Sequence, residues 1–172
     1  MPTPDGCDIR VAVERTDDDA VTALMVEYLA WAHDRLRSEY GVTEPPADPG
    51  LERSKLIQYR RPRGLLLLAE VQGEAAGVGA LRWLDDAVAE VKRMYVRPSS
   101  RGAHVGSALL DRLLDETTVR QATTVRLDTV RFMADAQSLY RSRGFEERPA
   151  YEGTEIPPRL QQYRLFFERQ AG

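Results

Sequence analysis

Apolar residues along the chain follow two spacings, one helical and one extended. From Ala20 to Leu36 they recur at every third or fourth position, which predicts an amphipathic helix whose apolar side faces a core. Leu65–Val71, Ala75–Trp83 and Ala87–Val96 are instead apolar runs divided by turn residues, and they predict three consecutive antiparallel strands. A weaker alternation at Ile9–Val13 predicts a first strand ahead of the helix.

The second half of the chain alternates between helical and extended patterns. We expect a helix from near Val105, a short strand around Val125–Leu127, a helix over Phe132–Arg143 and a last strand over Tyr163–Phe167. Gly144 is placed to end the preceding helix in a left-handed conformation. Hairpins followed by such an alternation predict a mixed α/β sheet with helices on its faces.

Polar and helix-breaking residues mark the joints between these elements. Thr16–Asp19 offers side-chain acceptors for the free amides at a helix start. Gly41–Gly50 is rich in proline and lacks periodicity, so we expect a loop there, placed to act as a lid over a substrate. A short helical stretch over Leu51–Tyr59 should follow it.

Composition and charge narrow the class of protein. The 172 residues are 42% hydrophobic, which suits one core and a single domain over residues 1–172. A formal net charge of -3 with both signs interspersed favours neither nucleic acid nor an anionic membrane as a partner. No apolar run approaches the length of a membrane span, and Met1–Asp8 does not read as a secretory signal. We therefore expect a cytoplasmic protein with residues 1–8 flexible.

Cysteine and histidine are too sparse to build a structural centre. Cys7 is the single cysteine and cannot form an intrachain disulfide, and we place it in the flexible N-terminus without a nucleophilic role. The two histidines lie far apart in the sequence, so no metal site is predicted.

One junction carries a candidate site for an anion. Arg97–His104 is irregular and runs directly into the helix that starts near Val105. The first amides of a helix have no intrahelical partner, and the helix dipole adds positive charge there. Backbone donors from Gly102 to Ser107 can therefore hold a phosphate, although a loop of this kind alone is a weak signal.

Two sequence blocks make the signal more specific. Arg101-Gly102-Ala103-His104-Val105-Gly106 resembles the Arg/Gln-x-x-Gly-x-Gly/Ala signature of the GCN5-related N-acetyltransferase (GNAT) superfamily. Further on, Ala136–Phe145 resembles that family's A-x-x-L-Y-x-x-x-G-F segment, in the right order and at a similar distance. The close resemblance covers about Leu65 to Tyr151, and the rest of the chain matches in the order of predicted elements.

The resemblance implies a fold and a cosubstrate. The fold would be a central mixed sheet of about six to seven strands, with helices on both faces and a V-shaped cleft between the strand ending at Val96 and the strand near Val125. Acetyl-coenzyme A (acetyl-CoA) would lie in this cleft without a metal, its pyrophosphate in the loop and its pantetheine arm along the strand. The implied cofactor-binding residues are Met94, Tyr95, Val96, Arg101, Gly102, Ala103, His104, Val105, Gly106 and Ser107.

The chain departs from the family pattern at two positions. His104 stands where the first glycine of the signature is common, and its side chain either crowds the phosphate or, when protonated, adds a donor. Met133 stands where the family often has an asparagine that bonds the cofactor. The contact of that asparagine is then lost or supplied by a neighbour, and we expect weaker coenzyme binding rather than none.

The resemblance also supplies two candidate catalytic residues. Tyr140 matches the tyrosine that protonates the departing thiolate in this family, and its alternative is a core tyrosine. Glu90 lies four residues before Met94 and on the same strand face, since side chains repeat every second residue, and it resembles the carboxylate that serves as a base. Its alternative is a solvated glutamate paired with Lys92 or another basic residue.

Other candidates have plain alternatives. An acceptor pocket could involve Tyr28, Trp31, His33 and Tyr40, although aromatic residues on an early helix are more often core. Asp128 and Arg131 suit either a polar contact or a solvated turn, and the basic patch Arg60–Arg63 suits either an acidic partner or a solvated loop.

The sequence therefore predicts an N-acetyltransferase that moves an acetyl group from acetyl-CoA to a primary amine by direct attack. The acceptor is a small-molecule or peptide amine that the sequence does not identify. The alternative is a non-catalytic acyl-CoA sensor or partner-binding module with the same fold. The resemblance also suggests a homodimer, with the tail after Gly153 as an exchanged strand. A nucleotide-binding domain is set aside, since no Gly-x-x-x-x-Gly-Lys-Ser/Thr motif occurs.

Overall fold

A mixed sheet of seven strands runs through the residues that the structure, a computed structural model, describes, 6–171. Its strand order is β1-β2-β3-β4-β5-β7-β6, and the neighbouring strands are antiparallel except β4 and β5, which are parallel. The strands are β1 (Cys7–Val11), β2 (Gly64–Val71), β3 (Glu74–Trp83), β4 (Val88–Val96), β5 (Thr124–Val130), β6 (Glu146–Arg148) and β7 (Arg164–Gln170). The predicted mixed α/β sheet is confirmed.

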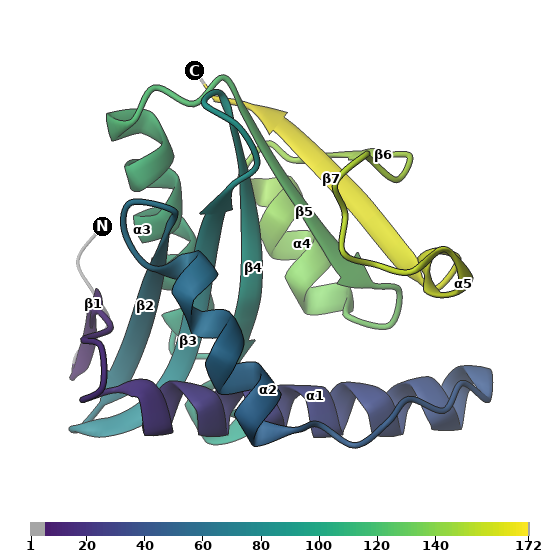
Figure 1. The fold of residues 1–172 in the computed structure, drawn as a ribbon, viewed down its shortest axis with the longest axis horizontal. Helices are drawn as coiled ribbons and strands as arrows, with labels where there is room; N and C mark the ends of the chain where they lie inside the picture. The colour runs from purple at the N-terminus through teal and green to yellow at the C-terminus, as the bar shows by residue number, and fades with distance from the viewer. Residues whose placement is uncertain (1–5, 172) are drawn as a thin grey trace.

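Helices cover both faces of this sheet, with α2 in front of it and α4 behind it in Figure 1. The helices are α1 (Asp18–Tyr40), α2 (Pro49–Ser54), α3 (Val105–Val119), α4 (Ala134–Ser142) and α5 (Pro158–Gln161), with 3-10 turns η1 (Lys55–Tyr59) and η2 (Pro98–Ser100). Alternate residues of β2 serve the two faces: Leu65 packs in the core under α3, and Leu66 in the core under α1. This explains why β2 reads as an unbroken apolar run. No helix in the described part of the chain is long and apolar enough to cross a membrane.

The start of α1 differs from its prediction. Asp17 occupies the N-cap position, but its side chain makes no capping hydrogen bond. It accepts instead from the guanidinium of Arg10, at 2.6 Å and 3.0 Å, and from the amide of Val13 at 2.6 Å. The carboxylate that sequence reasoning assigned to the helix therefore fixes the turn between β1 and α1.

The N-terminal prediction is wrong for Cys7 and Asp8, which are the first two residues of β1 and pair with Val71 and Glu70. Cys7 is 8% exposed, and burial raises the pKa of its thiol. Residues 1–5 of the expected flexible segment lie outside the described residues.

The C-terminal tail completes its own sheet. β7 pairs along its whole length with β5 and carries β6 on its other edge. It separates β5 from β6, so the two consecutive strands are not neighbours.

The two central strands part after a short contact. β4 and β5 pair only through Val88–Glu90 and Thr124–Arg126, at the top of the view in Figure 1, and they diverge below it. The rest of β4 therefore has a backbone edge toward β5 that no strand covers.

Candidate functional site

The parting of β4 and β5 opens onto a cleft of about 520 Å³. Its walls come from α1, the outer end of β4, the loop before α3, and the loop that leads into α4. The lining includes all but one of the predicted cofactor residues: Met94, Tyr95, Val96, Arg101, Gly102, His104, Val105, Gly106 and Ser107. Ala103 is exposed in the same loop but is not among the residues that line the cleft.

The start of α3 presents free amide groups at one end of this cleft. His104 is the N-cap residue with a left-handed φ of 58°, and its side chain makes no capping hydrogen bond. The first intrahelical bond runs from the amide of Ala108 to the carbonyl of His104, which leaves the amides of Val105, Gly106 and Ser107 free of intrahelical partners. These donors, with the helix dipole, fit a pyrophosphate.

Glycine leaves space at the same place. A β-carbon on Gly106 would meet Val96 at 3.8 Å and Leu139 at 3.9 Å, which are ordinary contacts. The protein's own packing does not require glycine at this position, so the space is free for a ligand that approaches the backbone.

The edge of β4 that faces away from β3 has backbone groups placed to form hydrogen bonds with an amide. The amide of Arg97 donates to the carbonyl of Ala76 on β3 at 2.8 Å, and in an antiparallel ladder the neighbouring Val96 then points its own amide and carbonyl away from β3. The carbonyl of Val96 accepts from Nε of Arg101 at 3.1 Å. This edge fits the amides of a pantetheine arm once Arg101 releases it.

Tyr140 lies on α4 and lines the cleft, as predicted. Its residue is 5% exposed, and its ring packs near Phe145 and Phe167, with centroids 6.0 Å and 6.3 Å away. Burial raises the pKa of its hydroxyl well above the ordinary value, with smaller contributions from Tyr28 and Asp128. The hydroxyl of this lining residue is therefore held in its protonated form.

A bulge in β4 overturns the expected placement of Glu90. Between the pairs Ala80–Lys92 and Val78–Tyr95, β4 has one residue more than β3, and Arg93 takes a left-handed φ of 56°. The extra residue shifts the alternation, so Met94 packs toward α3 while Glu90 points to the opposite face. The assumption of regular alternation from Glu90 to Met94 was wrong.

Glu90 is fully buried and already bonded. It is 0% exposed, accepts from Nε of Arg82 at 2.7 Å and from the hydroxyl of Tyr151 at 2.7 Å, and does not line the cleft. The nearby carboxylate raises the pKa of Tyr151, after burial as the larger cause. Glu90 can meet an amine in the cleft only if it leaves these partners.

A charged network surrounds Glu90 on this face. Nζ of Lys92 lies 3.4 Å from Asp128, 3.5 Å from Glu155 and 3.8 Å from Glu90. Burial by itself would lower the pKa of Lys92, but the three carboxylates outweigh it and the pKa rises. Asp128, which sequence reasoning allowed as a solvated turn, has a side chain only 4% exposed and also accepts from Arg164 at 3.1 Å.

Three buried groups beside the bulge escaped sequence reasoning. The guanidinium of Arg93 lies 3.3 Å from Glu52 on α2, which also accepts from Lys55 at 2.8 Å. Nε of Arg93, Oε2 of Glu52 and the hydroxyl of Tyr59 are buried without a hydrogen-bond partner in the described residues. No local pattern in the sequence marks these groups, because the Arg93–Glu52 contact joins residues far apart in the chain.

Aromatic residues of α1 form the wall that faces α4. Tyr28 and Trp31 line the cleft with Phe132, and Trp31 meets Phe132 edge-on with centroids 5.7 Å apart. Tyr40 stacks on Tyr163 at 4.9 Å and is not part of the lining. His33 also lies outside the lining, so the predicted aromatic pocket is brought together only in part.

Other predicted polar residues serve the scaffold. Arg131 donates to the carbonyl of Gln162 at 2.7 Å, and Met133 is the N-cap of α4, where Sδ accepts from the hydroxyl of Thr129 at 3.3 Å. In the basic patch, Arg61 lies 2.8 Å from Glu116, so the patch is not wholly solvated.

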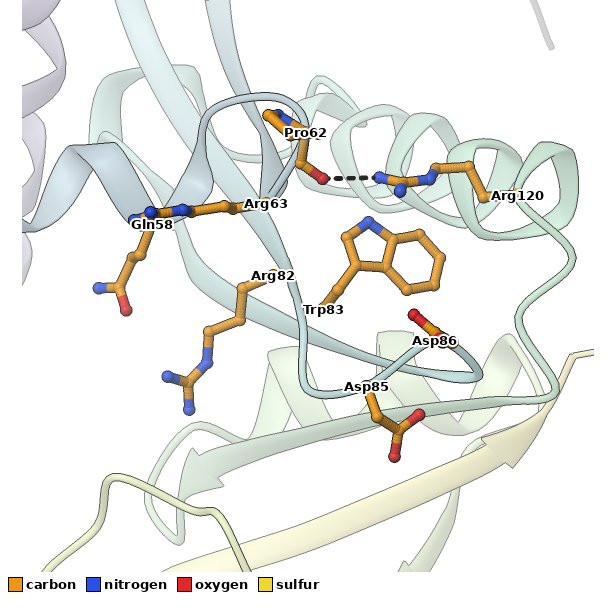
Figure 2. Close-up of a pocket in the computed structure, with 8 residues that line it drawn as sticks. All are labelled: Gln58, Pro62, Arg63, Arg82, Trp83, Asp85, Asp86 and Arg120. Atoms are coloured by element: carbon orange, nitrogen blue, oxygen red, sulfur yellow. Dashed lines mark hydrogen bonds between the residues drawn. The ribbon is translucent and has the colours of Figure 1, made fainter.

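A second cavity, of about 470 Å³, lies at the turn between β3 and β4 (Figure 2). Arg120 stacks over the ring of Trp83 at 4.5 Å and donates to the carbonyl of Pro62 at 3.0 Å. Asp85 accepts from two amides of its own turn. Three arginines and two aspartates line this cavity, so charge of both signs faces it and favours no single class of ligand. Among residues 6–171, no group of three or more candidate metal ligands occurs.

The fold is a mixed α/β sheet that opens into one cleft between two central strands, and this arrangement has known counterparts. The sequence profile of the "Acetyltransferase (GNAT) family" matches residues 25–145. The chain therefore belongs to the GNAT family.

Individual relatives match over shorter stretches. An "IAA acetyltransferase" of Azospirillum brasilense is 35% identical over 89 residues, which are 51% of this chain and 58% of that protein. An uncharacterized N-acetyltransferase of Schizosaccharomyces pombe is 32% identical over 102 residues, 58% of this chain and 63% of that protein. The match thus spans less than two thirds of the length of either relative.

Solved structures agree with the fold over nearly the whole chain. An acetyltransferase of Streptococcus agalactiae superposes with a TM-score of 0.74 at 18% identity, covering 96% of this chain and 98% of that one. The Salmonella typhimurium protein yncA, solved with its cofactor acetyl-CoA, gives a TM-score of 0.69 at 19% identity, covering 97% and 95%.

Proposed function

We propose that the protein transfers an acetyl group from acetyl-CoA to the primary amine of an acceptor. One observation carries this proposal: a single cleft joins the free amides at the start of α3, the uncovered edge of β4 and the protonated hydroxyl of Tyr140. The yncA structure with acetyl-CoA adds support from a protein of the same fold.

The residues of this cleft divide the work. The amides of Val105, Gly106 and Ser107 hold the pyrophosphate, and the edge of β4 at Val96 positions the arm. Acetyl-CoA supplies the activated acetyl group as a thioester. Tyr140 donates its proton to the departing sulfur as the amine attacks the carbonyl carbon. Arg101 moves from Val96 to the phosphate side, where a guanidinium is a strong anion partner.

Removal of the amine's own proton is assigned to water. The carboxylate oxygens of Glu90 are bonded to Arg82 and Tyr151 inside the protein. Glu90 therefore remains a candidate base only if the Tyr151 hydroxyl, which donates to it, relays the proton. Glu90 in this scheme holds Tyr151 and Arg82 in place. A cytoplasmic location and a homodimer also remain predictions.

A coupled binding and turnover experiment tests the proposal. Titration calorimetry with acetyl-CoA measures binding, and a thiol-release assay over a panel of amines, including small metabolites and peptides, measures transfer. We expect heat on binding and amine-dependent thiol release.

Binding without thiol release for any amine would favour the alternative, a non-catalytic acyl-CoA sensor. Two observations lend it support. Met133, whose thioether accepts from the hydroxyl of Thr129, lines the cleft where the family often has an amide, and His104 adopts a left-handed conformation that disfavours a residue with a β-carbon.

A further inference from the structure

The arms of the cleft are joined by side chains just beyond the point where the backbone ladder stops. Glu90 and Arg126 form the last pair of β4 with β5. Lys92 and Asp128 come two residues later on each strand, and Nζ donates to Oδ1 across the gap at 3.4 Å. An ion pair therefore takes over from the hydrogen-bond ladder.

Each partner of this pair is anchored within its own arm. Asp128 accepts from Arg164 of β7 at 3.1 Å, and β7 pairs with β5 along its length. Lys92 lies 3.8 Å from Glu90 of its own strand, which Arg82 of β3 also binds, and 3.5 Å from Glu155, which follows β6. A shift of one arm against the other would pull the pair apart.

The pair is shielded from water and lies next to the cleft. The side chains of Lys92 and Asp128 are 9% and 4% exposed, so solvent screens their attraction little. Met94, the first residue of β4 to line the cleft, follows directly after the bulge at Arg93. The ion pair thus lies between the closed end of the two strands and the site where the thioester would lie.

We propose that the Lys92–Asp128 ion pair is a strap that sets the width of the cleft and so positions acetyl-CoA against Tyr140. This proposal rests on the proposed function for its consequence in catalysis. Lys92 and Asp128 are positioning residues that act through the separation of the arms, and neither takes part in proton transfer.

Two readouts test the strap, one of which needs no ligand. Spin labels at Ser99→Cys and Ser138→Cys, both exposed and on opposite arms, in a Cys7→Ala background, report the distance between the arms in the free protein. Lys92→Met and Asp128→Asn should each broaden the distance distribution. Each should also raise the Kd of acetyl-CoA about tenfold. The double variant should exceed Lys92→Met little in either change, because Lys92→Met already removes the pair with Asp128 together with the contact to Glu155.

Conservative and control variants separate the strap from general damage. Lys92→Arg and Asp128→Glu keep the charges, so they should fold and keep the Kd within about threefold, since the pairwise attraction survives. Glu168→Gln breaks the Arg126–Glu168 pair, at 2.8 Å, between β5 and β7, two strands that stay hydrogen-bonded. It should leave the distance between the arms and the Kd unchanged.

Specific outcomes would overturn the proposal. An unchanged distance distribution in both strap variants refutes it, even if the wild type fails to bind acetyl-CoA and the proposed function falls separately. Additive effects on Kd, or a loss of kcat and a shifted pH profile in Asp128→Asn but not in Lys92→Met, would show that Asp128 acts in the chemistry instead.

Discussion

Replacing Tyr140 with phenylalanine separates catalysis from binding and folding. The ring of Tyr140 is packed near Phe145 and Phe167, and phenylalanine keeps that burial. No side-chain hydrogen bond contributes to the pKa of the hydroxyl. Removing the hydroxyl should therefore lower the free energy of unfolding by about 1 kcal/mol or less. Calorimetry of unfolding should show a Tm within a few degrees of wild type.

Turnover should change far more. A positioned general acid contributes about 100-fold or more in rate, equal to about 2.7 kcal/mol of barrier. The thiol-release assay should therefore show kcat reduced about 100-fold, with the KM for acetyl-CoA within about twofold. Because its pKa is raised, Tyr140 should stay protonated up to at least the ordinary tyrosine pKa of about 10. Wild-type kcat should therefore not fall below that pH through deprotonation of this acid. Equal kcat for the two proteins at every pH would remove Tyr140 from the mechanism.

Three further substitutions test the cleft and the scaffold. Gly106→Ala should keep or raise the Tm, since the added β-carbon meets only ordinary contacts. The Kd for coenzyme A should rise about tenfold because the methyl group takes ligand space, and an unchanged Kd would contradict pyrophosphate binding at the start of α3. Gly64→Ala should destabilise by about 3 kcal/mol in urea unfolding, because its β-carbon would lie 2.1 Å from the carbonyl of Leu81; wild-type stability would refute this packing. Arg10 lowers the pKa of Asp17 in the folded protein. The stability that the Asp17 carboxylate contributes is therefore present above its pKa in the unfolded chain, and it is lost as pH falls through its lower pKa in the folded protein. Asp17→Asn should thus cost about 1–2 kcal/mol near pH 7, allowing for the partial exposure of Arg10, and the difference should shrink below pH 4; a constant difference would contradict the linkage.

Periodicity predicted those parts of the fold in which local pattern and burial agree. The unbroken apolar run of β2 and the rows of leucine on α3 specify their own partners, because each buries a continuous surface. The predicted cofactor loop reaches the cleft for a similar reason, since it depends on residues adjacent in sequence. Met94, Val96 and Arg101–Ser107 lie within a short segment, and the structure brings all of them except Ala103 to the cleft.

Contacts between distant residues could not be predicted in the same way. Glu90 changed its surroundings because one extra residue at Arg93 altered the alternation of β4, and no local pattern announces a bulge at an arginine. The partners of Lys92 and Asp128 depend on where β4 and β5 stop pairing, which is a property of the sheet. Asp17 was expected to cap a helix because its competing partner, Arg10, belongs to another element.

Titration calorimetry of the wild-type protein with coenzyme A and acetyl-CoA tests the central claim most directly. If the free amides at the start of α3 hold a pyrophosphate, both ligands should release heat with one-site stoichiometry, and the Gly106→Ala variant should bind more weakly at an unchanged Tm. A folded wild-type protein that shows neither heat nor a thermal shift at millimolar concentrations of both ligands would contradict the account.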